Sequence, residues 1–458
     1  MQIFSKQTAK PGSMQELIPI AMPIFFSQAI DVAMMFCDRY FLARLGKEEL
    51  AATLSGGILC YVITALLYGT LGQVIALVGQ YQGAGETSNS IKTVHQAFFL
   101  TLVFSPIFFA LAYLFSPYLF ELFGHEKMLY ENELKYFRIL ALIVITTPLR
   151  LVFANFFIGI GKTSVVTLAS FVGVTINIPL SYILIFGGFG IPSLGIEGAA
   201  IGTILASLIP IVILAVTFYS PQYREEYNTA ITPRFNWQIF RKLLRYGLPA
   251  GVDMFVNVSA FLFFTMVMYS YSSDVAAATT IVLNWDMVSF LPLMGISQAV
   301  SGQIGKYLGE KKKDIALSCS WSAIKLAWCY ALLVTIIYLS FTDFLVDLFI
   351  TKEETNSLQQ VFYYGRIMLQ ISCFYLVFDA TYNVLGGILK GSGDTVWTMI
   401  VTNTCMWTCA LVTYFLKNHF AISPIYSWIM LTIMVFCLGT TFLIRFLQKK
   451  WLNRMMIE

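Results

Sequence analysis

The feature that most constrains this chain is a series of long segments almost free of ionisable side chains. Residues 98–120 and 324–341 are two of them, and each is long enough as a helix to cross about 30 Å of hydrocarbon. They do not alternate apolar and polar residues with period two, which argues against a membrane β-barrel. Only 12% of all residues are charged, whereas soluble globular proteins carry about 25%. The sequence therefore predicts an all-α polytopic membrane protein.

Apolar runs bounded by charged residues or by glycine and proline clusters predict about twelve transmembrane helices. The first run follows a polar start without a small-residue cleavage pattern, so we expect it to remain in the protein as a span. The runs lie near residues 17–42, 51–79, 92–116, 134–160, 164–187, 195–219, 247–272, 276–303, 315–341, 358–389, 396–416 and 424–446.

Lysine and arginine are concentrated in alternate connections between these runs. One set includes the groups at 241–245 and 311–313 together with Lys390, whereas the opposite set has few basic residues and contains the acidic stretches 126–133 and 352–354. Basic connections usually face the cytoplasm. We therefore expect a multi-pass protein of the plasma membrane, the inner membrane in a bacterium, with both termini cytoplasmic.

The two halves of the chain match each other when one is shifted by 226 positions. Gly79 and Gly83 then fall on Gly305 and Gly309, and other residues of three apolar segments match at the same offset. Six crossings separate equivalent points, and this even number gives both halves the same orientation. Parallel repeats with a binding site at their interface are a recurrent plan of transporters. Two bundles that rock about a shared cleft would give alternating access.

The longest polar connection lies near the centre of the chain and separates the two halves. We therefore expect an N-terminal six-helix bundle at 1–220, a cytoplasmic linker at 221–246 and a C-terminal six-helix bundle at 247–458. Residues 237–246 mix apolar and basic side chains, which favours a helix that lies along the cytoplasmic membrane surface.

Other features argue against an enzyme, a metal protein or a nucleic-acid partner. The eight cysteines lie mostly in apolar runs without paired CxxC spacing, and the three histidines are scattered. The net charge of +4 is mild. We expect no catalytic residues, no cofactor and no bound metal apart from Na⁺, if that is the ion that the protein uses.

Five aspartates interrupt the apolar runs. An ionised Asp at the centre of a membrane helix costs roughly 2.5–3.5 kcal/mol on insertion scales, so such residues usually face the protein interior and serve transport. A carboxylate in a dry cleft can bind a proton or remain charged and hold a cation. The five residues are Asp31, Asp38, Asp253, Asp286 and Asp379.

Four stretches resemble the multidrug and toxic compound extrusion (MATE) family, within the multidrug/oligosaccharidyl-lipid/polysaccharide exporter (MOP) superfamily. They are Cys37–Arg39, Ile191–Thr203, Gly247–Pro249 and Gly391–Thr395. The pattern Pro-x-Leu-Gly-x-x-Gly-Ala-Ala within the second stretch is the most specific. The resemblance covers essentially all twelve runs. It implies an antiporter, coupled to Na⁺ or H⁺, that exports organic cations, drugs or toxic compounds by alternating access.

The resemblance implies a cation site in the first half. Asp38 aligns with the acidic residue that the family uses, and the other ligands fall on Asn177, the carbonyl of Ala199 and Thr203. These groups supply the several oxygen atoms that a small hard cation prefers. A second acid, present in one branch of the family, is replaced here by Ser181, which argues against a mechanism with two carboxylates in this half.

The resemblance also implies a cation site in the second half. The acid that one branch of the family carries on the seventh span falls on Asn257, which is neutral. Asp253 lies one helical turn before Asn257 and Asp286 lies two residues after Asn284, and either one would restore the charge. The candidate residues of this site are Asn257, Asn284, Tyr375, Asp379, Asp253 and Asp286.

A cleft for varied organic cations is expected to be apolar and aromatic with a few acids. Residues near the aspartates are the candidates for its lining. They are Asp31, Met34, Met35, Phe36, Phe255, Trp285 and Phe290. The partners that we expect are therefore small organic cations and the lipid bilayer, with the protein acting as a monomer.

Two other functions compete with this prediction. A flippase for lipid-linked oligosaccharides or polysaccharides needs basic groups to hold phosphates, and only Arg39, Arg150, Lys325 and Arg366 lie in or near the spans. An integral membrane enzyme needs a catalytic cluster at the interface, which the sequence does not show.

Overall fold

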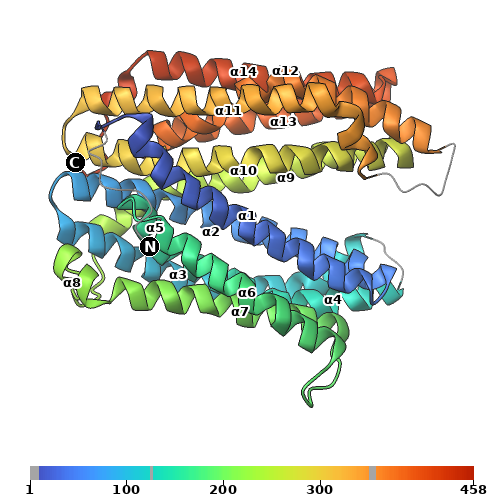
Figure 1. Cartoon of the computed structure of the whole chain (residues 1–458), viewed down its shortest axis with the longest axis horizontal. Coiled ribbons are helices and arrows are strands. Elements are labelled where there is room, and N and C mark those ends of the chain that lie inside the picture. Colours follow the sequence, from blue (N-terminus) through green and yellow to red (C-terminus); the bar gives the residue numbers. More distant parts are fainter. Residues whose placement is uncertain (1–9, 124–126, 350–356, 458) are drawn as a thin grey trace.

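The computed structural model describes residues 10–123, 127–349 and 357–457, and these fold almost entirely into helices (Figure 1). The elements are α1 (Met14–Ala43), α2 (Lys47–Gly83), α3 (Thr87–Phe123), α4 (Lys127–Leu140), α5 (Ile143–Gly159), α6 (Ser164–Phe186), α7 (Gly195–Phe218), α8 (Pro221–Tyr227), α9 (Trp237–Tyr269), α10 (Ser273–Gly309), α11 (Lys313–Asp347), α12 (Ser357–Ser392), α13 (Thr395–Phe420), α14 (Pro424–Leu447) and the 3₁₀ helix η1 (Lys450–Asn453).

The described residues contain twelve helices or helix pairs that are long and apolar enough to cross a membrane, with α4 and α5 forming one of them together. The prediction of about twelve spans is therefore confirmed. Large apolar side chains such as Phe115, Ile336 and Phe374 are more than half exposed on the outside of the bundle, as expected where lipid rather than water surrounds the helices. Of the two acidic connections, 352–354 lies outside the described residues, whereas Glu133 is buried in α4.

The helices form two halves joined by α8. In Figure 1, α2 to α7 (blue to green) lie below α10 to α14 (yellow to red), and α1 (dark blue) runs obliquely from beside α11 on the left down to the lower half. The start of α1 and the end of α14 lie at the same end of the bundle, on the left. Residues 237–246, expected to form a helix along the membrane surface, are helical and form the first turns of the long helix α9. The Asn236 side chain caps this helix by accepting the N–H of Ile239 at 3.1 Å. None of the glycines that follow in α9 has a positive φ that would end the helix.

The two halves meet where α2 packs against α10, and the repeat makes this contact symmetric. A Cβ atom at Gly79 would lie 2.5 Å from the carbonyl oxygen of Gly302, and one at Gly305 would lie 2.6 Å from that of Ala76. Residues 76 and 302 are themselves related by the 226-residue offset. The two contacts are therefore the same contact seen from each half, as a twofold axis between the halves requires.

The same reciprocity continues about one turn further along both helices. A Cβ atom at Gly83 would collide with the Lys306 carbonyl oxygen, and one at Gly309 would collide with the Gln80 carbonyl oxygen. Glycine is required at these positions because only a residue without a side chain lets the two backbones come so close. The glycines that match between the halves in sequence thus occupy equivalent positions in the contact between α2 and α10.

The segment after α14 packs back against this interface. Trp451 of η1 is fully buried, and the backbone N–H of Met456 donates to Gln80 Oε1 at 2.8 Å. The Gln80 side chain in turn donates to the carbonyl of Gly391 at 3.2 Å. Gln80 therefore joins α2 of the first half to α12 of the second half and to the C-terminal segment.

Candidate functional site

A cluster of polar groups surrounds Asp38 between α1, α6 and α7. The hydroxyl of Thr203 lies 3.2 Å from Asp38 Oδ2 and 3.0 Å from the carbonyl oxygen of Ala199, so it can donate to either acceptor. Asn177 donates to Ser181 at 3.3 Å, and Ser181 lies close enough to interact with the Asp38 carboxylate. The structure thus brings the four residues predicted for the first half into one cluster, together with Ser181.

Two oxygen atoms of this cluster have unused hydrogen-bonding capacity. Asp38 Oδ1 and Asn177 Oδ1 are both buried and find no hydrogen-bond partner within the described residues. A buried acceptor without a partner costs about 1–3 kcal/mol, and more if it is charged. A small cation bound at Asp38 would satisfy its free oxygen, and a proton would neutralise the carboxylate. The chemistry of the cluster therefore suits either ion.

In the second half, the predicted residues are arranged around a pair of carboxyl groups. The hydroxyl of Tyr375 donates to Asp286 Oδ2 at 2.5 Å, whereas Asp379 accepts from the side chain of Asn383 at 3.0 Å. The carboxyl groups of Asp286 and Asp379 are close enough to interact electrostatically. Of the two acids considered as replacements for the missing charge, Asp286 therefore lies beside Tyr375 and Asp379.

The other acid, Asp253, is engaged elsewhere. Its Oδ2 atom forms a 2.8 Å ion pair with the ammonium group of Lys390, and its side chain is only 5% exposed. Asn284 is exposed and donates to the carbonyl of Thr280 within its own helix. Asn257 makes no hydrogen bond within the described residues, so neither asparagine is linked to the Tyr375–Asp286 pair.

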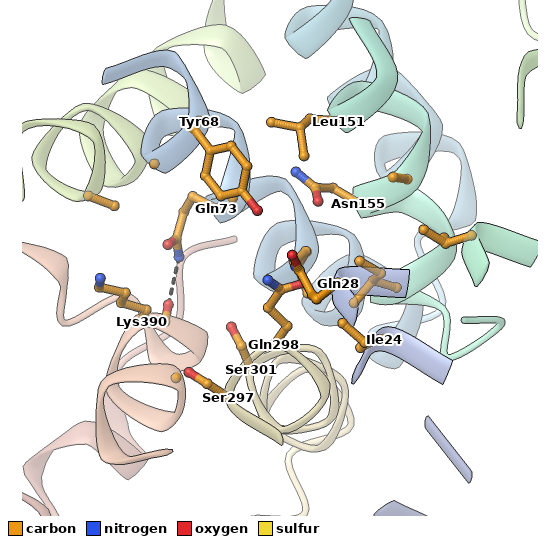
Figure 2. A pocket seen from close by; sticks show the side chains of 18 of the residues that line it. Ile24, Gln28, Tyr68, Gln73, Leu151, Asn155, Ser297, Gln298, Ser301 and Lys390 are labelled. Atoms are coloured by element: carbon orange, nitrogen blue, oxygen red, sulfur yellow. Dashed lines mark hydrogen bonds between the residues drawn. The ribbon is translucent and has the colours of Figure 1, made fainter. Parts of the chain in front are cut away.

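A central cavity of about 170 Å³ lies between the two halves and is lined by α1, α2, α5, α6, α9, α10 and α12. Figure 2 shows its polar side chains converging from both halves: Gln28, Tyr68, Gln73 and Asn155 from the first and Gln298, Ser301 and Lys390 from the second. The side chain of Gln73 donates to the backbone carbonyl of Lys390 at 2.6 Å, which links α2 to α12 across the cavity.

Asp31 also lines this cavity, where it is paired with a base. Both terminal nitrogens of the Arg150 guanidinium group lie 3.0 Å from Asp31 Oδ2. About a quarter of each side chain remains exposed, 24% for Arg150 and 29% for Asp31. Asp31, which was predicted to line a substrate cleft, thus lies at the space between the halves with its charge compensated by Arg150.

The other six residues predicted for a substrate cleft do not line this cavity. Phe36 is five residues after Asp31, which places it about 140° around the helix, and it is 70% exposed. Trp285 packs against Tyr338 and Phe349, and its indole N–H donates to the carbonyl of Leu345 at 3.0 Å. A place in a substrate cleft stays a prediction for Met34, Met35, Phe36, Phe255, Trp285 and Phe290.

Sequence reasoning missed most of the polar lining because it searched for acids and aromatic residues. Neutral amides inside apolar runs, such as Gln28 and Asn155, are also costly to bury and were a usable signal. Lys390 was counted among the basic connections, but the structure places it inside the last turn of α12, facing the cavity.

Comparisons with known proteins agree with this architecture. The MatE family model matches residues 23–183 and again 249–416, so the second match begins 226 residues after the first, at the offset of the repeat. A probable multidrug resistance protein NorM of Thermotoga maritima is 26% identical over 451 residues, which are 97% of this chain and 94% of that protein.

Solved structures show the same fold. A MATE protein in complex with MaL6 superposes with a TM-score of 0.86 at 20% identity, covering 96% of this chain and 97% of its own. A MOP superfamily transporter from Pyrococcus furiosus, described as having a binding pocket of reverse polarity, gives a TM-score of 0.86 at 19% identity and covers 98% and 100% of the two chains. This chain belongs to the MatE family, whose members are multi-pass membrane transporters and not enzymes.

Proposed function

We propose that this protein is an antiporter that exports small organic cations, drugs or toxic compounds and is driven by the inward movement of Na⁺ or H⁺. The observation that carries the proposal is the cluster around Asp38. Among the described residues, this membrane-embedded carboxylate is hydrogen-bonded by neutral hydroxyl groups, and one of its oxygen atoms has no partner. Its relatives include proteins named for multidrug resistance.

The cluster suits coupling because Asp38 is stabilised both when an ion is bound and when it is not. With Na⁺ or H⁺ bound, Asp38 is neutralised; without it, the charge is stabilised by the Thr203 hydroxyl and by Ser181. An inward cation is helped by the membrane potential, which contributes about 2.3 kcal/mol per elementary charge at 100 mV. This free energy drives the outward step if binding of the ion and binding of the exported molecule oppose each other.

The second half offers a parallel site. Asp286 and Asp379 interact with each other and with Tyr375 and Asn383, and two nearby carboxyl groups favour uptake of one proton or cation between them. We propose that this pair binds a coupling ion as well, with Asp286 supplying the charge that Asn257 lacks.

The twofold contact between α2 and α10 supports alternating access. Two halves related by symmetry can rock about this contact, so that the cavity between them opens to one side and then to the other. We place the end of the bundle that holds the start of α1 and the end of α14 in the cytoplasm of a bacterial cell, because the basic connections gather there. The transporter is expected to act as a monomer without a cofactor.

Export of lipid-linked sugars is less well supported. Its phosphate groups would need free basic side chains, but both bases at the central cavity are already paired with acids, Arg150 with Asp31 and Lys390 with Asp253.

A dye-efflux assay in cells that lack their own multidrug pumps tests the proposed function. Asp38→Asn keeps the size and polarity of the side chain but removes its charge, so we expect efflux to fall to background at unchanged expression. Asp343→Asn is the matched control, because this carboxylate is 60% exposed and forms its ion pair with Arg366. Full efflux by the Asp38→Asn variant would rule out the coupling role of Asp38.

A further inference from the structure

The charges at the central cavity form two ion pairs, one from each half. Asp31 of α1 pairs with Arg150 of α5, and Asp253 of α9 pairs with Lys390 of α12. Asp31, Arg150 and Lys390 line the cavity, whereas Asp253 lies behind Lys390. Each half therefore brings both a positive and a negative group to the space between them.

The acids of both pairs are engaged by their bases. Asp31 Oδ2 is held by both terminal nitrogens of Arg150. Asp253 is 5% exposed, while its partner Lys390 is 35% exposed, so on this wall the cavity meets an ammonium group rather than a carboxylate. Among the described residues that line the cavity, none offers an unpaired carboxylate to an organic cation.

The neutral polar groups at the cavity can both donate and accept. Gln28 and Gln298 face each other from α1 and α10 in Figure 2, and neither makes a hydrogen bond within the described residues. A side-chain amide binds an anionic group through its NH₂ and a cationic group through its carbonyl. The walls thus suit both ends of a dipolar molecule.

From this arrangement we propose that the substrate bound in the central cavity is a zwitterion, an organic cation that also carries a carboxylate or similar acidic group. Its acidic group contacts the Lys390 ammonium in the second half, and its cationic part lies toward Asp31 in the first. The inference rests on the proposed export function and specifies the substrate class.

The physical reason is the cost of uncompensated charge in a cavity between membrane helices. A zwitterion can exchange partners with the two ion pairs, so that every charge in the cavity still has an opposite charge beside it. A simple organic cation loses its hydration on entering and finds only acids that are already paired, which leaves its own charge or that of a base uncompensated.

Two dyes that differ by one ester test this inference. Rhodamine 123 is a cationic methyl ester, and rhodamine 110 is the corresponding free acid, which carries a carboxylate on the same ring system. Both dyes must widen the cavity to about the same extent, because they differ in size by one methyl group. A difference between their transport rates therefore shows the effect of the acidic group. In proteoliposomes with an imposed cation gradient, we expect the purified full-length protein to transport rhodamine 110 at least fivefold faster than rhodamine 123.

Substitutions test whether the preference for rhodamine 110 depends on the Asp253–Lys390 ion pair. Lys390→Gln should lower transport of rhodamine 110 at least fivefold and with it the preference for this dye over rhodamine 123. Because this variant leaves Asp253 without its partner, the double variant Asp253→Asn/Lys390→Gln is tested as well; it removes both charges and should show the same loss of preference. Lys325→Gln is the control, since Lys325 is exposed on α11 and lies outside the cavity.

The outcomes separate this inference from the function on which it rests. Transport of rhodamine 123 with rhodamine 110 excluded would overturn the zwitterion preference and leave the export function standing. Equal transport of both dyes, unaffected in the double variant, would overturn it too. Transport of neither dye under a Na⁺ or a proton gradient would count against the proposed function and against the inference with it.

Discussion

At the level of single residues, the membrane-embedded aspartates divide into two groups according to their neighbours. Asp31 and Asp253 each touch a base. Asp38, Asp286 and Asp379 meet only hydroxyl and amide groups among the described residues that hydrogen-bond to them. A carboxylate that is paired with a base has little use for a further cation, whereas one among neutral dipoles gains from binding an ion. The second group is therefore the one that we connect with coupling.

The Thr203 hydroxyl provides a graded test of this distinction, because it touches Asp38 without carrying charge. Thr203→Val keeps the shape of the side chain and removes the hydrogen bond, so the coupling ion should bind more weakly by about 1 kcal/mol, or roughly fivefold in apparent affinity. Thr203→Ser restores the hydroxyl and should recover most of the affinity. The measurement is the transport rate as a function of ion concentration; a maximal rate that falls without any change in ion affinity would speak against a ligand role.

The sequence identifies individual site residues where burying their side chains in a membrane helix is costly. The aspartates were found because charge is rare in apolar runs, and Asp38, Asn177, Ala199 and Thr203 do lie together. Which acid lies beside Tyr375 could not be predicted, because it depends on how α10 is rotated relative to α12. Lys390 was missed for a similar reason: a basic residue near a helix end has the same appearance in sequence whether it faces a connection or a cavity.

At the level of elements, the closest contact between the halves depends on glycines that the repeat duplicates. Gly309→Ala would place a methyl group against the backbone of α2 at Gln80, and neither backbone can move without separating the helices. We expect a lower thermal unfolding temperature for the detergent-solubilised protein and reduced transport.

Gly57→Ala is the control for this prediction, since a Cβ atom at Gly57 in α2 meets nothing within 4 Å. That change should leave stability unaltered or raise it by up to about 1 kcal/mol, because alanine favours a helix over glycine. Equal stability of Gly309→Ala and Gly57→Ala would mean that the halves are not in such close contact at α2 and α10.

At the level of the whole molecule, the number of spans and the relation between the halves could be predicted from sequence, because both depend on long-range patterns that packing does not alter. The twelve candidate spans and the two matches to the MatE model agree with those patterns. The character of the cavity could not be predicted in this way. It depends on which side chains from seven helices converge on one point, and the acids and bases that look like separate charges in sequence are paired there.

The two halves together act as a coupled antiporter only if movement of an ion drives movement of the substrate. The central claim is that the carboxyl groups outside the ion pairs perform this coupling, with the cation site of the first half centred on Asp38. Transport by the purified protein in proteoliposomes, with sodium and proton gradients imposed separately, addresses the claim without interference from other pumps.

We predict that at least one of the two gradients drives uphill accumulation of dye, that an ionophore which collapses this gradient stops it, and that Asp38→Asn abolishes it. Accumulation that persists after both gradients are collapsed, or that is undiminished in the Asp38→Asn variant, would contradict the account.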